Sequence, residues 1–499
     1  MTKQWFAAVG LAFLLAGASP AGAGGPPVSE ATQGCLECHT SVTPGIVAAW
    51  RASAHAKTTP AQARKKTALA RRVSSKKIPP SLAGTVVGCA ECHTQNPQAH
   101  ADSFAHDAYT VHVVPSPRDC ATCHAEEAAQ YQHNLMSQAY GNLMANPLYR
   151  SLVAEVLGPR RLVGGALQRL RADAATRADA CLSCHGTVIK VTGHIKRQTD
   201  MGEMSFPVLA GWPNQGVGRI NPDGSKGSCA SCHARHRFSI ATARRPYTCG
   251  QCHKGPDVPA FKVWAASKHG NLFTSASQGF NLTAVPWQVG RDFTAPSCAA
   301  CHVSLVTNSD GDVLAKRSHA MSDRIDTRIF GAPYAHPHPQ SADTSRLKAP
   351  DGLPLAASLD GKPAARGLIS RAEQAKRRQN MQAVCLGCHA TAVVEGQFAR
   401  LDHTVRTTNQ VVALATQIMQ EAWRSGRARG PAQGGSAFDE YIEKVWTQLW
   451  LFYANSTRLA SAMMGADYGA FEGGRWQMTM SLEHLRHLAR KAGRQKSRP

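Results

Sequence analysis

The sequence has few acidic residues, few aromatic residues and no long apolar run. Its 499 residues hold 33 Asp and Glu against 56 Lys and Arg, a formal net charge of +23, and only 6% are aromatic. No stretch beyond the N-terminus reaches about 18 apolar residues, so no membrane-spanning helix is expected. No cysteine stands outside one repeated motif, which excludes a disulfide framework and an odd reactive thiol.

The repeated motif is Cys-x-x-Cys-His, in eight copies that use every cysteine. The cysteines are Cys35, Cys38, Cys89, Cys92, Cys120, Cys123, Cys181, Cys184, Cys229, Cys232, Cys249, Cys252, Cys298, Cys301, Cys385 and Cys388. The histidines that end motifs 1 to 8 are His39, His93, His124, His185, His233, His253, His302 and His389. Zinc knuckles do not require a histidine after each Cys-x-x-Cys unit, so the pattern argues against zinc. It is the attachment signal of c-type haem, and it predicts eight covalently attached haems with these histidines as proximal iron ligands.

Eight haems alter what the net charge and the low aromatic content of the chain imply. Their roughly 16 propionate groups offset much of the positive charge, so the basic balance does not predict a nucleic-acid partner. The porphyrins also form much of the core, which explains how so few aromatic residues suffice. Residues 57–84 and 486–499 hold eight and six Lys and Arg with no acid. Each run is either a solvated surface or a docking surface for an acidic redox partner.

The N-terminus predicts export. Residues 1–23 combine Lys3, an apolar run and a small-residue cleavage site at Ala21-Gly22-Ala23, as a signal peptide does. The alternative is a membrane anchor, but the apolar run of about 12 residues is too short to span a bilayer. We expect a periplasmic, soluble mature chain that begins near Gly24, because covalent haem attachment follows export.

The predicted fold is mainly α, with eight stacked haems, long loops and a C-terminal bundle of long helices. Residues 24–400 form the octahaem region, in which the Pro- and Gly-rich stretch 302–385 predicts extended loops. Residues 401–499 form a helical region, with helices expected over 405–424, 438–463 and 475–491. In 438–463 the apolar residues follow a spacing of four and three, with a start near Ser436 and a stop at Gly465. Few alternating strand patterns are present.

Fourteen histidines lie outside the motifs, and some must be distal iron ligands. A purely electron-transferring protein needs eight distal histidines, and an enzyme with one open iron needs seven. The fourteen available histidines permit both. The predicted distal ligands are His55, His112, His236, His269, His319 and His336. His55 and His269 share the pattern Trp-x-x-Ser-x-His, and His336 and His338 alternate with prolines that fix the backbone.

Several stretches resemble the octahaem hydroxylamine oxidoreductase family. They include residues 211–259, SKHGN at 267–271, RSHAMSDR at 317–324, YAHPHP at 334–339, VCLGCH at 384–389 and MMGADYGAFEG at 463–473. The resemblance covers nearly all of the mature chain. It implies a homotrimer with contacts in the C-terminal helical region, and a catalytic fourth haem with an open distal position. In oxidising members a Tyr of the neighbouring subunit is bonded to that haem.

The resemblance carries these roles to particular residues. The catalytic haem would be held by motif 4, with His185 proximal, and the cross-linking residue would be Tyr468. The pocket would contain Asp257 and Tyr334. Two departures are present, because Val258 stands where the family has His and Phe471-Glu472-Gly473 replaces an aromatic-His-Gly sequence. From the residues alone, Asp257 could equally be a turn residue and Tyr468 an ordinary residue at a helix end.

The expected activity is oxidation of hydroxylamine or a related small nitrogen compound, with electrons passed to a soluble or membrane-bound cytochrome. Asp257 would be the base that removes protons from the substrate. One alternative is reduction of nitrite or hydroxylamine, although the Cys-x-x-Cys-Lys motif of related nitrite reductases is absent. The other is a multihaem electron-transfer protein without a catalytic site.

Overall fold

The computed structural model describes residues 25–495, so the predicted signal peptide lies outside the described residues. The described chain is mainly helical, which confirms the predicted class. The helices up to motif 7 are short and are α1 (Glu30–Val42), α2 (Pro44–Arg51), α3 (Pro60–Arg64), α4 (Pro80–Ala83), α5 (Cys89–His93), α6 (Pro117–Cys120), α7 (Ala125–Gln132), α8 (Ala139–Met144), α9 (Pro147–Leu157), α10 (Ala174–Asp179), α11 (Cys181–His185), α12 (Ala230–His233), α13 (Ile240–Arg244), α14 (Pro246–Gly250), α15 (Ala260–Ala265), α16 (Lys268–Ala276) and α17 (Cys298–His302).

Several of these helices are the motifs themselves. One helical turn carries Cys181, Cys184 and His185 in α11, and the same is true of α5 and α17. Residues three and four apart share one face of a helix. The first cysteine, the second cysteine and the histidine of a motif therefore lie together, as two thioether bonds and one iron ligand require.

The strands are short and form small separate sheets. They are β1 (Ser103–His106), β2 (Tyr109–His112), β3 (Arg160–Val163), β4 (Ala166–Arg169), β5 (Lys190–Thr199), β6 (Gly202–Ala210), β7 (Trp287–Gln288), β8 (Val306–Thr307), β9 (Val313–Ala315), β10 (Thr327–Arg328) and β11 (His336–Pro337). The β5–β6 hairpin is the largest, and the sequence did not predict it. Most of β5 is exposed, so its residues do not alternate between apolar and polar as in a half-buried strand.

The C-terminal part contains the three longest helices within residues 25–495, α18 (Arg371–Leu386), α19 (Thr391–Arg424) and α23 (Arg475–Gln495). The shorter helices α20 (Tyr441–Gln448), α21 (Asn455–Met463) and α22 (Ala466–Ala470) lie between α19 and α23. The helix α18 corrects the expectation of loops over all of 302–385. It begins at Ser370, whose side chain accepts a hydrogen bond from the amide of Glu373. The preceding residues 303–370 contain only short strands among loops.

The helix expected over 438–463 begins later and is interrupted. A capping box of Glu440 and Glu443 starts α20 at Tyr441 in place of Ser436, and the π-helical segment Leu449–Ala454 separates α20 from α21. The carboxylate of Glu443 accepts a hydrogen bond of 2.7 Å from the indole of Trp423 on α19. The apolar residues of α19, α20 and α23 form one buried core, with Leu449 and Leu485 fully buried.

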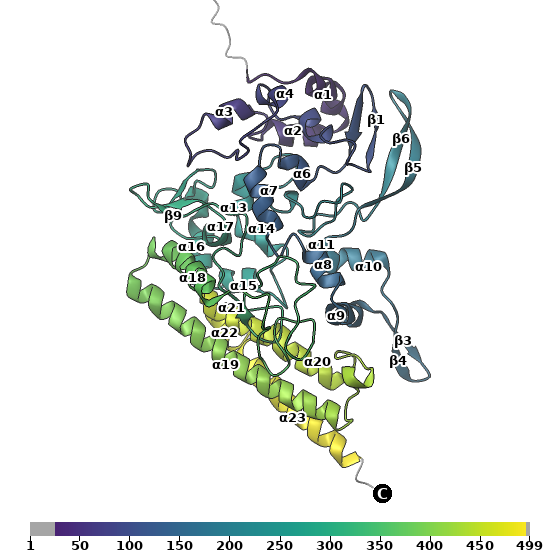
Figure 1. Ribbon diagram of the computed structural model, residues 1–499, viewed down its shortest axis with the longest axis vertical. Helices are drawn as coiled ribbons and strands as arrows, with labels where there is room; N and C mark the ends of the chain where they lie inside the picture. The colour runs from purple at the N-terminus through teal and green to yellow at the C-terminus, as the bar shows by residue number, and fades with distance from the viewer. Residues whose placement is uncertain (1–24, 496–499) are drawn as a thin grey trace, which may run out of the picture.

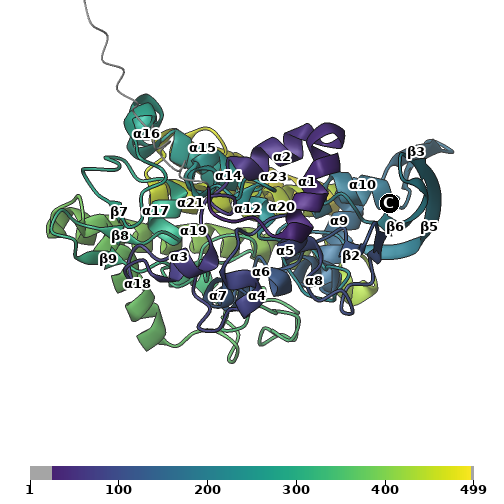
Figure 2. The same cartoon turned by 90° about the horizontal axis from the view of Figure 1, so that it is seen from above.

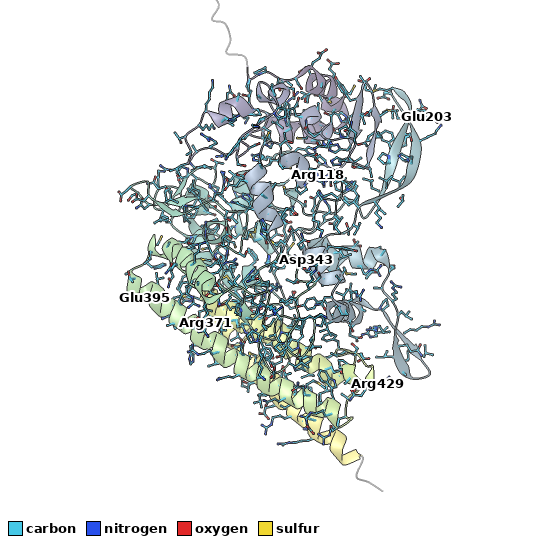
Figure 3. All side chains as sticks on the ribbon, in the orientation of Figure 1. Arg118, Glu203, Asp343, Arg371, Glu395 and Arg429 are labelled. Atoms are coloured by element: carbon cyan, nitrogen blue, oxygen red, sulfur yellow. The ribbon has the colours of Figure 1, made fainter. Side chains whose placement is uncertain are left out.

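The molecule is elongated, with the N-terminal helices at one end and α19 and α23 at the other (Figure 1). The β5–β6 hairpin projects from one side and α18 lies on the opposite side, as the second view confirms (Figure 2). Glu203 on this hairpin and Arg429 beyond α19 lie far apart along the long axis (Figure 3). No helix within residues 25–495 is long and apolar enough to cross a membrane.

Candidate haem cavity and catalytic site

One continuous cavity of about 2490 Å³ runs through the molecule. Every motif contributes its histidine and at least one cysteine to the cavity wall. An ordinary pocket for one small ligand measures about 300–1,000 Å³. The size of the cavity and the even distribution of thiols and imidazoles along it therefore fit a row of covalently attached haems.

The motifs meet in an order that differs from their order in the chain. Neighbouring thiols shift each other's pKa between motifs 1 and 2 (Cys35 and Cys89), 3 and 5 (Cys120 and Cys229), 4 and 6 (Cys184 and Cys252), and 6 and 7 (Cys249 and Cys298). Weaker electrostatic contacts join motifs 2 and 3, 5 and 6, and 7 and 8. The motifs therefore form the line 1-2-3-5-6-7-8, and motif 4 branches from motif 6.

Five motif histidines lie about 6 Å from a second imidazole. The ring centres are 6.0 Å apart for His39 and His106, 6.0 Å for His93 and His112, 6.2 Å for His124 and His55, 6.3 Å for His233 and His319, and 5.9 Å for His389 and His269. Two metal–nitrogen bonds of about 2 Å, and about 1 Å from each nitrogen to its ring centre, also give about 6 Å. These pairs have the spacing of two ligands on opposite sides of one iron.

Four of these five partners, His55, His112, His269 and His319, are among the predicted distal ligands, and His106 is not. His106 lies on β1 and pairs with Tyr109 on β2 at the turn end of this hairpin. The alternating residues Ser103 to His106 could have suggested a strand that directs the imidazole to one face. Nothing in the sequence indicates which motif histidine would lie opposite this face of the strand.

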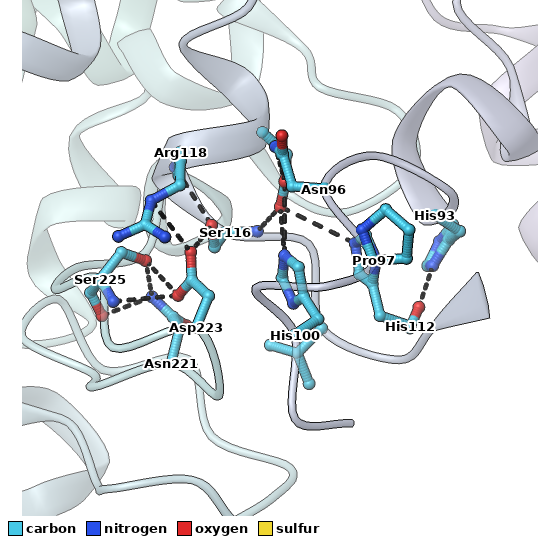
Figure 4. A network of polar contacts seen from close by, with 12 residues as sticks. His93, Asn96, Pro97, His100, His112, Ser116, Arg118, Asn221, Asp223 and Ser225 are labelled. Atoms are coloured by element: carbon cyan, nitrogen blue, oxygen red, sulfur yellow. Dashed lines mark hydrogen bonds and ion pairs between the residues drawn. The ribbon is translucent and has the colours of Figure 1, made fainter. Parts of the chain in front are cut away.

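His112 differs from the other four partners in its surroundings. The His93 ring of motif 2 donates from Nδ1 to the backbone carbonyl of His112 at 2.8 Å (Figure 4). The His112 ring also stacks on His100 with 3.7 Å between the ring centres. His236 lines the cavity as well and interacts electrostatically with His93, so His112 and His236 are both candidate partners for motif 2.

The stacked imidazoles belong to a buried ionic network. His100 lies 3.3 Å from Asp102 and 3.1 Å from Asp119. Burial lowers the pKa of His100, but the two carboxylates outweigh burial and raise it to about 9. Burial and the neighbouring His100 lower the pKa of His112 to about 4. One ring is therefore cationic and the other neutral near pH 7, which stabilises the stack beside motif 2.

His336 and His338 have similar hydrogen bonds and different surroundings. Each donates from Nδ1 to the carbonyl of the following proline, at 2.7 Å for His336 and 2.9 Å for His338. Each Nε2 is therefore the nitrogen left for another partner. His338 lines the haem cavity, whereas the predicted ligand His336 lines a small separate cavity.

Charged side chains surround the motif histidine His185. Its Nδ1 donates to the carbonyl of Ala139 at 3.3 Å. Burial lowers the pKa of His185, Asp257 raises it and Arg328 lowers it, so both charges lie close to the ring. Asp257 also acts on the thiols of Cys181 and Cys184. The structure thus brings together the predicted site residues His185 and Asp257 and adds Arg328.

The backbone positions Asp257 in the cavity wall. Gly255 has a φ of 84°, which only glycine adopts without strain, and it turns the chain into the Pro256-Asp257 segment. The carbonyl of Asp257 accepts a hydrogen bond of 3.1 Å from Asn455 on α21. The next residue, Val258, packs against an apolar cluster that contains Val263 and Leu459. The carboxylate of Asp257 therefore lies in the cavity wall while its neighbour anchors the loop.

The two predicted tyrosines lie outside the cavity wall of their own chain. Tyr334 is buried in the C-terminal core and donates to the carbonyl of Leu359 at 2.8 Å. Tyr468 is half-buried, packs near Val258 and donates to Glu472 at 3.2 Å. Burial and then Glu472 raise the pKa of Tyr468 to about 12. Neither hydroxyl faces His185 within the single chain.

Two family models match parts of the chain. The model described as "Seven times multi-haem cytochrome CxxCH" matches residues 218–326. The model described as "Cytochrome c554 and c-prime" matches residues 34–113. A curated relative is a probable nitrite reductase-hydroxylamine oxidoreductase fusion protein of Kuenenia stuttgartiensis, 28% identical over 253 residues. The match covers 43% of this chain and 29% of that protein, less than a third of the relative.

Two solved structures are similar to the whole fold. One, described as a hypothetical multiheme protein, is 41% identical with a TM-score of 0.88, and the match covers 94% of this chain and 97% of the other. The second belongs to the Kuenenia stuttgartiensis reducing HAO-like protein complex Kustc0457/Kustc0458. It is 18% identical with a TM-score of 0.61, covers 94% of this chain and 86% of the other, and shows a shared fold.

Proposed function

Because the chain belongs to the hydroxylamine oxidoreductase-like family of multihaem cytochromes c, we propose that it oxidises hydroxylamine or a related small nitrogen compound at motif 4. The observation that carries this proposal is the environment of His185. Five other motif histidines lie about 6 Å from a second imidazole, whereas the charged neighbours that act on His185 are Asp257 and Arg328. Within residues 25–495 no second imidazole pairs with His185, so an iron held there would have polar groups around it.

Eight haems would be held by the sixteen motif cysteines and the eight motif histidines. The distal ligands would be His106 for motif 1, His112 or His236 for motif 2, His55 for motif 3, His319 for motif 5 and His269 for motif 8. His336 and His338, each with Nε2 left for another partner, would serve motifs 6 and 7, so that seven distal ligands leave motif 4 open. At motif 4 the haem would supply an open iron that binds the substrate nitrogen and accepts its electrons.

Asp257 would receive the substrate's protons. Oxidation of one hydroxylamine and one water to nitrite releases four electrons and five protons, so a proton acceptor near the substrate is required. The carboxylate of Asp257 lies in the cavity wall close to motif 4. Val258 carries no titratable group, so Asp257 would act without the family's histidine. General-base assistance typically contributes about 100- to 10,000-fold in rate.

The branched arrangement of motifs suggests the route of the electrons. Motif 4 contacts motif 6 through Cys184 and Cys252. Electrons from motif 4 would enter the line of haems at motif 6 and leave toward motif 1 or motif 8. A soluble or membrane-bound cytochrome in the periplasm would receive them. The stretch 57–84 carries the exposed Lys65 and Lys66, and the amides of Ser74 and Ser75 in the same stretch donate to the Cys123 carbonyl of motif 3, so an acidic partner could dock there.

We also propose a homotrimer with contacts in residues 401–499 and a bond from Tyr468 to the motif 4 haem of a neighbouring subunit. Phe471 and Trp476, on either side of the turn after Tyr468, are 68% and 55% exposed. Large apolar side chains exposed together mark interaction surfaces. The placement of Tyr468 outside its own cavity is compatible with a role in another subunit.

Reduction of nitrite or hydroxylamine is the second candidate. Val258 stands where the oxidising family members have a histidine, and a half-buried cation, Arg328, acts on His185. Reduction of nitrite to ammonia consumes six electrons, which the other seven haems could store and deliver. A cation beside the iron favours an anionic substrate, so this observation supports the reductive direction.

Stopped-flow absorption tests the proposed function. Oxidised protein mixed with hydroxylamine should show rapid reduction of its haems, and the rate should saturate with hydroxylamine concentration. Reduced protein mixed with nitrite should show slower oxidation. Rapid oxidation of the haems by nitrite, together with no reduction of the haems by hydroxylamine, would mean that the protein reduces nitrite and does not oxidise hydroxylamine. A protein whose haems respond to neither compound would be an electron-transfer protein without a catalytic site.

A further inference from the structure

The hairpin of β3 and β4, with the residues on either side of it (156–172), is an exposed arm. All four residues of each strand are exposed, and the two strands form a sheet of their own. The hairpin lies at the edge of the molecule in Figure 1, and β3 does so again in Figure 2. A two-stranded hairpin with no covered face is only marginally stable in water. The arm therefore has the properties of an element that another surface covers.

The tip of the arm is apolar. Leu162 and Leu167 are directly opposite each other in the sheet, and they are 67% and 73% exposed. Val163, on the other face of the sheet, is 42% exposed. The Gly164-Gly165 turn joins the strands, and a Cβ at either glycine would meet no atom within 4 Å. The three apolar side chains do not line the haem cavity, so bound haem would not cover them.

The base of the arm is basic and is fixed to its own chain. The arm contains four arginines and no acid. Arg160 and Arg169 pair with the buried carboxylate of Glu155 on α9. The other two arginines, Arg161 and Arg171, are exposed. The arm is therefore held at its base and presents an apolar tip beside two exposed positive charges.

The face formed by residues 467–483 of α22 and α23 has the opposite charge. Phe471 and Trp476 are exposed on it, and Met480, one helical turn after Trp476 on the same side of α23, is 49% exposed. None of these three side chains lines the haem cavity. The face contains three acids against one Arg, and the acid Glu472 is exposed next to Phe471. It therefore matches the arm both in apolar character and in charge.

We propose that the arm of one copy of this chain docks on the α22–α23 face of a second copy. This inference rests on the proposed function, because it names a contact that would hold the proposed homotrimer together. The arm and the face are different surfaces, so each copy offers one of each, and contacts of this kind close into a ring when the rotation allows it. The apolar tip covers the exposed aromatic side chains, and the arginines meet the acids at the rim.

The arm is also continuous with motif 4. Asp173, just beyond the arm, accepts a hydrogen bond of 2.7 Å from the amide of Thr176 and starts α10. This helix ends at Asp179, two residues before Cys181. The copy that docks on the arm carries Tyr468 on its α22. The contact would therefore bring the proposed cross-linking residue of one copy to the subunit whose haem it has to reach.

The mass of the holoprotein in solution tests the contact. The variants are Leu162→Ser/Leu167→Ser at the tip and Trp476→Ala on the face, with Ile195→Ser/Met201→Ser on the exposed β5–β6 hairpin as the matched control. Sedimentation equilibrium over a range of concentrations gives the Kd of assembly. Both test variants should raise this Kd at least about tenfold, because burial of one large apolar side chain contributes that factor. The control should match the parent, and all variants should keep the parental haem content.

Charge reversal provides a second test that leaves the apolar side chains in place. Arg161→Glu/Arg171→Glu should weaken the assembly, and Asp467→Arg/Glu472→Arg in the same chain should restore part of it. Restoration requires that the two pairs of charges lie close together across the contact. A fourfold variant as weak as the arginine variant would overturn the proposed pairing of arm and face.

The remaining outcomes separate the contact from the proposed homotrimer. A trimer whose Kd neither test variant changes would overturn the docking contact and leave the homotrimer standing, whereas a monomeric parent would overturn both. An effect confined to Leu162→Ser/Leu167→Ser would place the arm on another surface. If phosphatidylglycerol vesicles bind the parent and not this variant, and the mass stays unchanged, the arm binds a lipid surface instead. If this variant does not fold, Trp476→Ala and the charge reversals decide.

Discussion

Replacement of Asp257 by Asn tests whether Asp257 acts as the catalytic base or only shapes a turn. The substitution removes one negative charge and preserves the size of the side chain. In the described structure the backbone carbonyl of Asp257 holds Asn455, and this bond does not depend on the side chain. The fold and haem content should therefore be unchanged, and any loss of activity would come from the carboxylate.

The expected loss is at least about tenfold in turnover. General-base assistance spans about 100- to 10,000-fold, and the minimum of about tenfold is set below this range because Asp257 is exposed in a wide cavity. Asp257 nevertheless acts on His185, Cys181 and Cys184, so its charge reaches the place where the substrate would bind. A tenfold loss corresponds to about 1.4 kcal/mol of transition-state stabilisation.

The assay is stopped-flow reduction of the haems by hydroxylamine over a range of pH. Asp200→Asn, in the exposed turn between β5 and β6, provides the control for loss of one surface carboxylate. The Asp257 variant should be slow at every pH, and the control should match the parent. Equal rates for Asp257→Asn and the parent would mean that Asp257 only shapes the Gly-Pro-Asp turn.

Three further predictions concern neighbouring features. Val258→His should increase hydroxylamine oxidation in the same assay, because it restores a titratable group beside Asp257; no change in an inactive parent would point to another substrate. Denaturing electrophoresis should show haem-linked oligomers that disappear in Tyr468→Phe, and clean monomers of the parent would exclude the cross-link. Burial raises the pKa of Glu443 to about 7, above its unfolded value, so the folded state binds the additional proton and stability should fall as pH rises from about 4.5 to about 7. Glu443→Gln should reduce this fall in thermal unfolding experiments, and an unchanged pH dependence would contradict the assignment.

The motifs and the class of fold could be predicted because they depend on local chemistry. Cys-x-x-Cys-His defines its own helical turn, and the apolar spacing of the C-terminal segment predicts helices. The bounds were less accurate: α19 begins at Thr391, immediately after motif 8, and the π-helical segment at Leu449 interrupts a regular pattern. Both depend on packing against distant helices.

The partners of the motif histidines depend on long-range contacts, which explains the different placements of His106 and His112. Both lie on one hairpin, and each ring lies 6.0 Å from a motif histidine, but the sequence does not say which of them also stacks on His100. Arg328 was missed for the same reason. It acts on His185, which lies more than 100 residues earlier in the chain, and no motif marks it.

The most direct test of the account is electron paramagnetic resonance of the oxidised protein with and without cyanide. The account predicts one high-spin haem among eight, with a signal that changes when cyanide binds the open position at motif 4. The remaining haems should give low-spin signals that cyanide does not alter. Eight low-spin haems that all ignore cyanide would contradict the catalytic role of motif 4 and leave the protein as an electron-transfer wire.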